Sequence, residues 1–179
     1  MNTTEIFRCL AGRARPWGVL ASVLLAMSLS ACASQGDAPE KTVSLDILIE
    51  ADARVNADAQ GRPAPIQVRV FELKSRSIFE EADFFSLQGK PRQVLGGDLA
   101  ESDDLVLRPG DAKRIQRRAD PDTVAIGVVA GYRDLGRSVW RATFTMPPRQ
   151  TQSWYSSSSQ TVRVRIKAGA DTVAVTQAD

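Results

Sequence analysis

The stretch Thr123-Val124-Ala125-Ile126-Gly127-Val128-Val129-Ala130 carries no charged side chain at any position. A half-buried strand alternates polar and apolar residues, so an uncharged run without such alternation is typical of a strand buried on both faces. We therefore expect 123–130 to form the central strand of a sheet. Gly127, within the run, and Gly131, just after it, indicate close packing or a bend.

Segments on both sides of this central strand alternate with a period of two. Residues 43–50, 66–70 and 162–167 each place aliphatic side chains on one face only, as half-buried strands do. After 66–70, Phe71 and Leu73 fall on the opposite face, which indicates that this face becomes covered or that a bulge shifts the register. Further short strands are expected at 105–107, 113–118, 139–145 and 172–176.

The segment 113–118 is basic and polar apart from one isoleucine. Such a strand belongs at the edge of a sheet, where charge prevents pairing with other chains. Its four cations are either a solvated edge, which is our main interpretation, or a patch for phosphate or lipid headgroups. They are Lys113, Arg114, Arg117 and Arg118.

One helix is expected at about 77–88. Its start, Ser77-Ile78-Phe79-Glu80, matches a capping box, in which the serine oxygen accepts from the first turn and the glutamate reaches back. Apolar residues at 78, 82 and 85 recur at helical spacing, and Gly89 and Pro91 end the element. Residues 93–102 are expected to be irregular, with at most one helical turn. The side chains expected to cover part of a sheet are Phe79, Phe84, Phe85 and Leu87.

About eight short strands, one helix and no strand-helix-strand rhythm indicate an all-β protein. Two such sheets packed face to face give an antiparallel β-sandwich.

The first 31 residues have the features of a secretory signal. A basic segment with three arginines precedes the uncharged run 17–27. About eleven apolar residues span roughly 16 Å as a helix, too short for a hydrocarbon core of ~30 Å. The run ends in Leu29-Ser30-Ala31-Cys32, which resembles the lipobox of bacterial lipoproteins, where the cysteine thiol takes a diacylglyceryl group. The alternative is an ordinary signal peptide with an incidental cysteine.

These features predict three parts of the chain: a lipoprotein signal peptide at 1–31, a flexible tether at 32–42 and a β-sandwich domain at 43–179. Cys32 would become the first residue of the mature chain and carry three acyl chains, enough for stable anchoring. Ala33 follows it, and bacterial lipoproteins that stay in the inner membrane tend to have aspartate there. We therefore expect the outer membrane, with the domain facing the periplasm.

Composition excludes several classes of function. The signal holds three of the 23 basic and one of the 21 acidic residues, so the mature chain keeps 20 of each and is neutral. A nucleic-acid-binding role thereby loses its electrostatic basis. The chain has no histidine, which removes the commonest general base and most zinc sites. We expect no cofactor, no metal and no enzymatic activity; an enzyme that uses Glu80 or Asp83 is the remotest alternative.

A long loop is expected between the first two strands, at 51–65. It is rich in turn-forming residues, and loops of this length are usually functional or mobile. Pro63 and Pro65 stiffen its end, so less entropy is lost on docking to a partner. The alternative is a tolerated surface insertion. In a second loop, at 150–159, Trp154 and Tyr155 are either partner contacts or core residues, and the sequence does not decide between them.

Several segments, taken in order, resemble the TssJ family, the outer-membrane lipoproteins of the bacterial type VI secretion system. The resemblance spans most of the mature chain. It rests on the lipobox, on 56–65 running into Ile66-Gln67-Val68-Arg69-Val70-Phe71-Glu72-Leu73-Lys74, on 79–87, on Leu107-Arg108-Pro109-Gly110, on 127–134 and on Trp140-Arg141.

This resemblance implies a transthyretin-like β-sandwich with an added helix, and no catalytic activity. It implies a partner, the periplasmic C-terminal region of the inner-membrane protein TssM, and leaves room for an oligomer within the secretion complex. The contact element of the family is the loop between the first two strands. Carried over, its residues are Asn56, Gln60, Gly61, Arg62, Pro63, Ala64 and Pro65.

A competing class is a periplasmic ligand-binding lipoprotein of transthyretin-like fold. It would need an apolar pocket with a few convergent polar groups. No cluster in the sequence predicts such a pocket.

Overall fold

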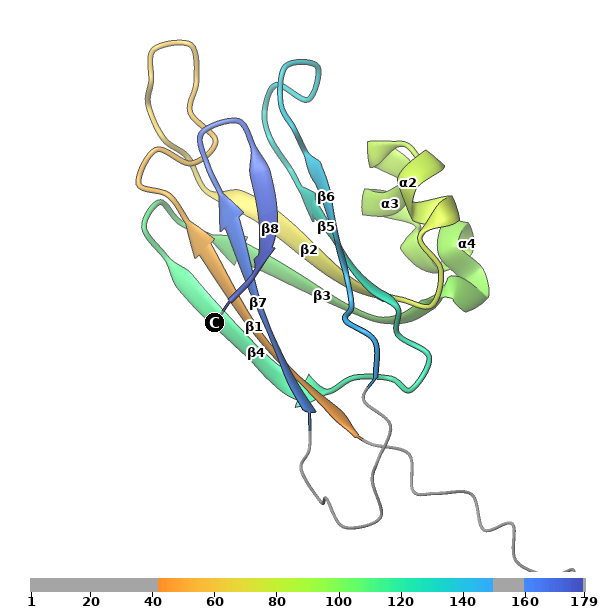
Figure 1. Ribbon diagram of the computed structural model, residues 1–179. Coiled ribbons are helices and arrows are strands. Elements are labelled where there is room, and N and C mark those ends of the chain that lie inside the picture. Colours follow the sequence, from red (N-terminus) through yellow and green to blue (C-terminus); the bar gives the residue numbers. More distant parts are fainter. Residues whose placement is uncertain (1–41, 150–159, 179) are drawn as a thin grey trace, which may run out of the picture. The chain divides into compact units, whose positions relative to one another are not determined.

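The computed structural model describes residues 42–149 and 160–178. These residues form two four-stranded sheets and a group of short helices (Figure 1). Sheet A has the order β4-β1-β7-β8 and sheet B the order β3-β2-β5-β6. The strands of sheet A are β1 (Val43–Ala51), β4 (Ala112–Arg118), β7 (Gln160–Ala168) and β8 (Val173–Gln177). Those of sheet B are β2 (Ile66–Leu73), β3 (Leu99–Leu107), β5 (Ala125–Ala130) and β6 (Arg141–Thr145).

The predicted all-β sandwich of about eight strands is confirmed, and it is compatible with a transthyretin-like arrangement. Neighbouring strands are antiparallel with one exception, since β1 and β7 pair in parallel from Val43↔Gln160 to Ala51↔Ala168. Because β1 lies in sheet A and β2 in sheet B, the loop between them passes from one sheet to the other.

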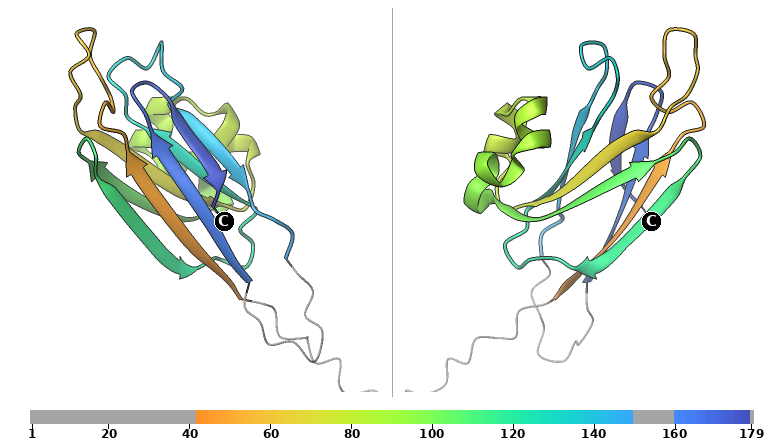
Figure 2. Two further views of the ribbon diagram at one scale, coloured as in Figure 1. Left: turned by 60° about the vertical axis from the view of Figure 1, so that its left-hand side comes forward. Right: turned by 180° about the vertical axis from the view of Figure 1, so that it is seen from behind.

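The central strand predicted at 123–130 is confirmed as β5, which begins two residues later than predicted and whose six residues are all buried. Alternate side chains of β5 enter two different cores. Ile126 and Val128 pack between the two sheets, whereas Ala125 and Val129 pack beneath the helices, which lie on the outer side of sheet B (Figure 2). This second layer also explains the parity change in β2, because Phe71 and Leu73 belong to the core under the helices. The register of β2 with β3 shifts at Glu72/Leu73 as well.

The prediction of a single helix at 77–88 is wrong, because the segment is divided into two helices. The structure has α2 (Ser77–Glu81), α3 (Phe84–Gly89), α4 (Pro91–Leu95) and the 3₁₀ turn η2 (Gly96–Asp98). Extended backbone at Ala82 ends the first helix. Asp83 then starts the second, because its Oδ1 accepts a hydrogen bond of 3.0 Å from the Ser86 backbone N–H. The capping box is also wrong, since Ser77 is the first helical residue and Arg76 precedes it without a side-chain cap.

Breaking the helix changes which side chains cover sheet B. Phe79 and Leu87 are fully buried in the core under the helices, as expected. Phe85, in contrast, is 75% exposed and Ile78 is 42% exposed. The predicted apolar stripe assumed one helical period across residue 82, and the extended backbone at Ala82 (ψ 147°) interrupts that period.

The neighbouring segment 93–102 is more regular than expected. Pro91 begins α4 instead of only ending a helix, as its fixed φ favours at a first helical position. The short strand expected at 105–107 extends back to Leu99, because its acidic residues find partners on other strands. Asp104 pairs with Arg69 of β2, and Asp103 pairs with Arg117 of β4.

The basic segment at 113–118 is confirmed as an edge strand, β4 of sheet A. The interpretation of all four cations as solvated is wrong for Arg117, which points between the sheets. Its Nε donates to Glu72 Oε1, and its Nη1 donates to Asp103 Oδ2 at 2.6 Å. Burial by itself would lower the pKa of Arg117, but these two hydrogen bonds outweigh burial and raise the pKa above its usual value. This ion-pair cluster joins the edge of sheet A to sheet B.

We expect Gly127→Ala to destabilise the domain by about 1–3 kcal/mol, the usual range for overpacking. An added Cβ at Gly127 would lie 2.7 Å from Phe79 Cζ and 2.9 Å from Leu73 Cδ1. Urea unfolding measures the change. Gly89→Ala is the matched control, because a Cβ there meets nothing within 4 Å. Equal stability of the two variants would contradict the close packing that we assign to Gly127.

Candidate functional site: the loop between the first two strands

The β1–β2 loop, residues 52–65, is anchored at both ends and through its interior. Its first amide, Asp52 N–H, donates to the Ala168 carbonyl of β7 at 2.8 Å. Val55 is fully buried in the core between the sheets. Ala64, also buried, donates its amide to the Val55 carbonyl at 3.1 Å, so the two arms of the loop are joined. The length of this loop therefore does not make it loose.

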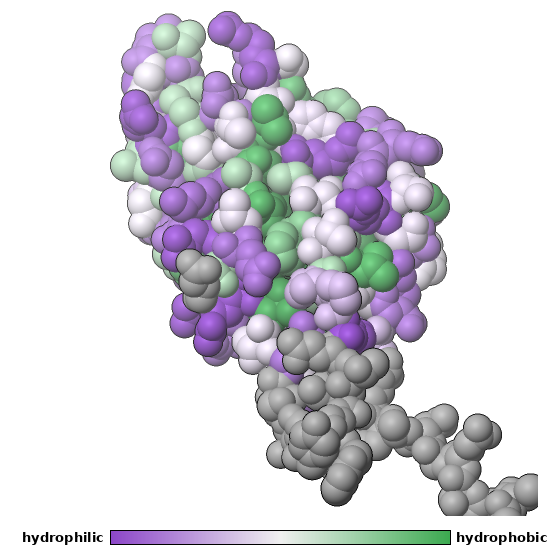
Figure 3. Space-filling view, viewed as in Figure 1, coloured by the Kyte–Doolittle hydropathy of each residue, from purple (hydrophilic) through white to green (hydrophobic). Residues whose placement is uncertain are grey.

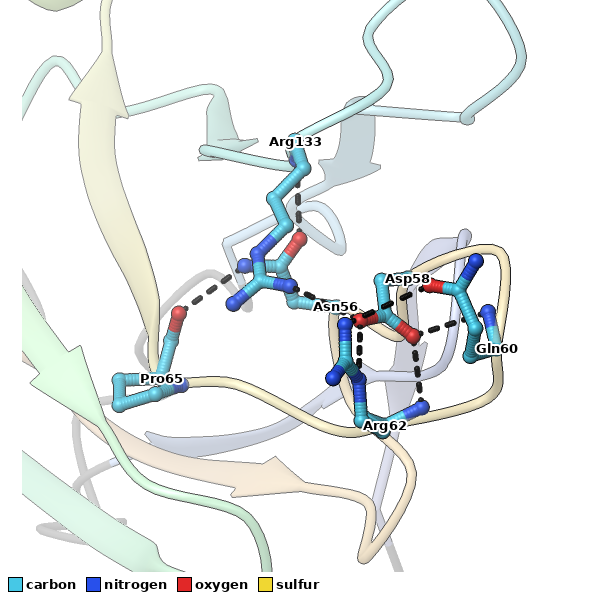
Figure 4. Close-up of polar contacts among 6 residues, drawn as sticks. All are labelled: Asn56, Asp58, Gln60, Arg62, Pro65 and Arg133. Carbon is cyan, nitrogen blue, oxygen red and sulfur yellow. Dashed lines mark hydrogen bonds and ion pairs between the residues drawn. The ribbon is translucent and has the colours of Figure 1, made fainter.

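Asn56 fixes the base of the loop to the rest of the domain (Figure 4). It is 5% exposed and takes the left-handed conformation, with φ at 52°, which asparagine tolerates better than most residues. Its Nδ2 donates to the Pro65 carbonyl at 3.0 Å, and its Oδ1 accepts from the Arg133 backbone N–H at 2.9 Å. One buried side chain thus holds the start of the loop, the end of the loop and the β5–β6 connection.

Asp58 closes the outer turn of the loop (Figure 4). Its Oδ1 accepts from the backbone N–H groups of Gln60 (3.0 Å) and Arg62 (2.9 Å). Its Oδ2 accepts from Arg62 Nε at 2.7 Å and lies 3.8 Å from Arg133 Nη1. The backbone hydrogen bond from Arg62 is the largest of several causes that lower the pKa of Asp58 below its usual 3.8. The carboxylate is ionised at neutral pH, and the lowered pKa lets it keep these hydrogen bonds at a lower pH than an ordinary aspartate would.

The seven predicted contact residues fall into two groups. Gln60, Gly61, Arg62, Pro63 and Pro65 are exposed, whereas Asn56 and Ala64 are buried. Gly61 has a φ of 75°, a conformation that glycine adopts without the steric cost that residues with a Cβ incur. The exposed tip is thus presented by a fixed backbone, and the two buried residues support it.

An open cavity of about 500 Å³ lies beside the loop. The β1–β2 loop, the β5–β6 connection and the turn between β7 and β8 all line it. Its walls carry charge, from Asp58, Arg133, Asp134, Arg137 and Asp171. A ligand-binding lipoprotein would be expected to have a mainly apolar pocket, and this cavity does not have that character.

Two supporting residues, Asp58 and Arg133, were not among the predicted site residues. A local signal exists for Asp58, because Asp-x-x-Gly is a common turn sequence. No local signal exists for Arg133, which reaches the loop only through the fold, 77 positions along the chain from Asn56.

Some predictions lie outside the described residues. These are Cys32 with the signal peptide, almost all of the tether, and Trp154 and Tyr155. Within 42–149 and 160–178, no helix is long and apolar enough to cross a membrane. The same ranges contain no group of three or more Cys, Asp or Glu side chains placed to hold a metal ion.

A protein-family model of type VI secretion lipoproteins, described by the names VasD, EvfM and TssJ, matches residues 43–170. That span is well over half of the chain. The chain belongs to the TssJ family. The match begins at the first residue of β1 and runs through the β1–β2 loop to the turn between β7 and β8.

Solved structures agree with membership in the TssJ family. The T6SS lipoprotein TssJ1 from Pseudomonas aeruginosa is 34% identical, with a TM-score of 0.68, over 77% of this chain and 98% of that one. Serratia marcescens Lip, described as a membrane bound component of the type VI secretion system, is also 34% identical, with a TM-score of 0.67, over 74% of this chain and 96% of that one.

A third match shares the fold alone. It is a chain in the structure described as "T6SS protein TssM C-terminal domain (869-1107) from EAEC", 22% identical with a TM-score of 0.57, over 74% of this chain and 97% of that one. No curated protein sequence matches the chain.

Proposed function

We propose that this TssJ-family chain is an outer-membrane anchor of the type VI secretion membrane complex, and that the tip of its β1–β2 loop binds the periplasmic C-terminal region of TssM. The observation that carries the proposal is the loop itself, whose exposed tip is presented by a hydrogen-bonded and partly buried base. A loop held in one conformation loses little entropy on binding.

The anchor is the second part of the proposal. Cys32 would be acylated after removal of 1–31, the segment 32–42 would serve as a tether, and the sandwich would face the periplasm. The function is then mechanical, because the acyl chains hold one end in the outer membrane and the loop holds a protein of the inner membrane. Such a role needs no catalytic group, in keeping with a sequence that has no histidine.

The choice of partner has separate support. Chains of this fold occur in structures described as the TssM C-terminal domain and as a "Type VI membrane complex". The exposed tip residues belong to the segment that the family resemblance assigns to this contact.

The test is a binding measurement with the periplasmic region of TssM. We expect the tip variant Gln60→Ala/Arg62→Ala/Pro63→Ala to weaken binding at least about tenfold, since these side chains would lie at the centre of the contact. The matched control, Arg92→Ala/Gln93→Ala, changes exposed residues of α4. Circular dichroism should be unchanged for both variants. Full binding by the folded tip variant would refute the assignment of this loop.

A further inference from the structure

The outer face of sheet A collects basic residues from two strands that are separate in sequence. Side chains of β1 and β7 alternate between the core and this face, and β4 and β7 pair with β1 on opposite sides. The register places Arg118 beside Ser44 and Arg114 beside Leu48 on one side of β1. On the other side of β1, the outward residues of β7 follow one another at every second position: Arg163, Arg165 and Lys167.

This basic face, defined as Arg114, Arg118, Arg163, Arg165 and Lys167, is only partly neutralised. Two acidic residues of β1 lie between the two basic rows: Asp46 is 3.2 Å from Arg114 Nε, and Glu50 is 3.5 Å from Arg165 Nε. Among the described residues, no acidic side chain forms an ion pair with the other three cations. Hydrophilic residues cover much of the left-hand side of Figure 3, where β4, β1 and β7 lie.

The excess of charge is local. Five basic residues stand against two acidic ones on this face, although the chain after residue 31 is neutral overall. Outside this face, residues 42–149 and 160–178 carry 14 basic and 15 acidic side chains, so the excess of positive charge lies on the basic face. A domain whose excess of positive charge lies on one face has a preferred orientation near an anionic surface.

We propose that the basic face of sheet A docks onto the anionic phospholipid headgroups of the membrane to which the chain is tethered. The inference rests on the acylated Cys32 of the proposed function and adds a second membrane contact to it. One lipid anchor combined with a basic surface is an established way to fix a protein on a membrane.

The tether favours a lipid surface over an acidic protein as the occupant. Ten residues separate Cys32 from Val43, the first residue of β1. Such a segment reaches at most about 35 Å when extended and about 17 Å on average when flexible. The basic face begins where the tether ends, with Arg118 beside Ser44. Each basic residue near an anionic bilayer improves binding by about fivefold, and the anchor makes the contact intramolecular.

The geometry also sets the position of the partner-binding loop. The nine residues of β1 span about 30 Å, and the β1–β2 loop follows its far end. Docking through sheet A would hold this loop alongside the membrane surface at a fixed height, whereas the acyl anchor alone would leave its direction free.

The test uses the unacylated chain from Ala33, because acyl chains would bind any vesicle. Both cores and both sheets lie within 42–178. The two solved relatives consist almost entirely of this domain, since the match covers 98% and 96% of their chains. We expect this chain to sediment with vesicles containing phosphatidylglycerol and not with pure phosphatidylcholine, and to be released as ionic strength rises.

The variant Arg163→Gln/Arg165→Gln/Lys167→Gln should lose at least about tenfold of this binding. Its matched control, Arg92→Gln/Arg108→Gln/Arg137→Gln, removes three exposed cations outside the basic face and should bind as the parent does. An equal loss in both variants would overturn the proposal, because net charge would then explain the binding. The proposal would also be overturned if the parent chain failed to bind anionic vesicles. The same holds if the basic face bound an acidic polypeptide such as polyglutamate but did not bind the vesicles.

Binding to TssM and binding to the membrane can be tested independently. The β7 variant should still bind the periplasmic region of TssM, and the loop-tip variant should still bind anionic vesicles. Loss of both activities in the folded β7 variant would contradict the separation of the two surfaces.

Discussion

Arg117→Leu should lower the free energy of unfolding by about 3 kcal/mol. The substitution leaves the Glu72 carboxylate, which is 1% exposed, without its charged partner. Removing one member of a buried ion pair costs about 3–5 kcal/mol, because the remaining charge stays desolvated. The lower end applies here, since the Arg117 side chain is 24% exposed. Urea unfolding of the parent and the variant measures the difference.

A double variant separates the lost ion pair from lost packing. Glu72→Gln keeps an oxygen that can accept from the Asp120 backbone N–H and the Thr123 hydroxyl, which Glu72 Oε2 now does at 3.2 and 3.1 Å. Arg117→Leu/Glu72→Gln should therefore be more stable than Arg117→Leu alone. The control Arg118→Leu changes the next, outward residue and should stay within about 0.5 kcal/mol of the parent. If the single and double variants are equally stable, the charge of Glu72 is not the cause.

Phe79→Ala should lower the free energy of unfolding by about 3–5 kcal/mol, the usual range for a fully buried phenylalanine. Phe79 is 0% exposed, and its ring centroid lies 5.5 Å from that of Phe71. It is the side chain through which α2 contacts sheet B, above Gly127. Thermal or urea unfolding gives the magnitude. The matched control is Phe85→Ala in α3, which removes a ring that is 75% exposed and should have little effect.

A mutant cycle tests the contact with β5 directly. The ring of Phe79 occupies the space that a side chain at residue 127 would need. Gly127→Ala should therefore be much less harmful in the Phe79→Ala background, and the two effects should be less than additive. Additive effects would show that the two sites do not share this space.

Strands were predictable from the sequence wherever the burial of their two faces produced a simple pattern of polar and apolar residues. The alternation of β1 and β7 reflects one face in the core and one in solvent, and the uncharged run of β5 reflects two buried faces. The position of the β1–β2 loop followed from its turn residues. Its support was not predictable in full, since Asn56 reaches Arg133 and the Ala168–Ala170 segment only in the folded domain.

The helical region shows where local patterns fail. Residues 77–88 carry a helical period and a serine at the start, yet the segment divides at Ala82–Asp83, because the Asp83 carboxylate satisfies a free backbone N–H at the start of a second helix. The exposure of Phe85 and the burial of Phe79 follow from this break. The four cations of β4 are similar in sequence, but strand pleating turns Arg117 inward and Arg114 and Arg118 outward.

The sequence by itself determined the kind of protein: an all-β sandwich with a central strand buried on both faces and a long, proline-stiffened loop after the first strand. These properties depend on residues close to one another in the chain, so they can be predicted from the periodicity of apolar residues and from the turn-forming residues. Only the tertiary structure decided that Asn56 and Ala64 support the loop while its tip faces solvent, and that β4 and β7 form one basic face. Those properties depend on pairing between distant segments, and the register of two strands is set by the packing of both sheets.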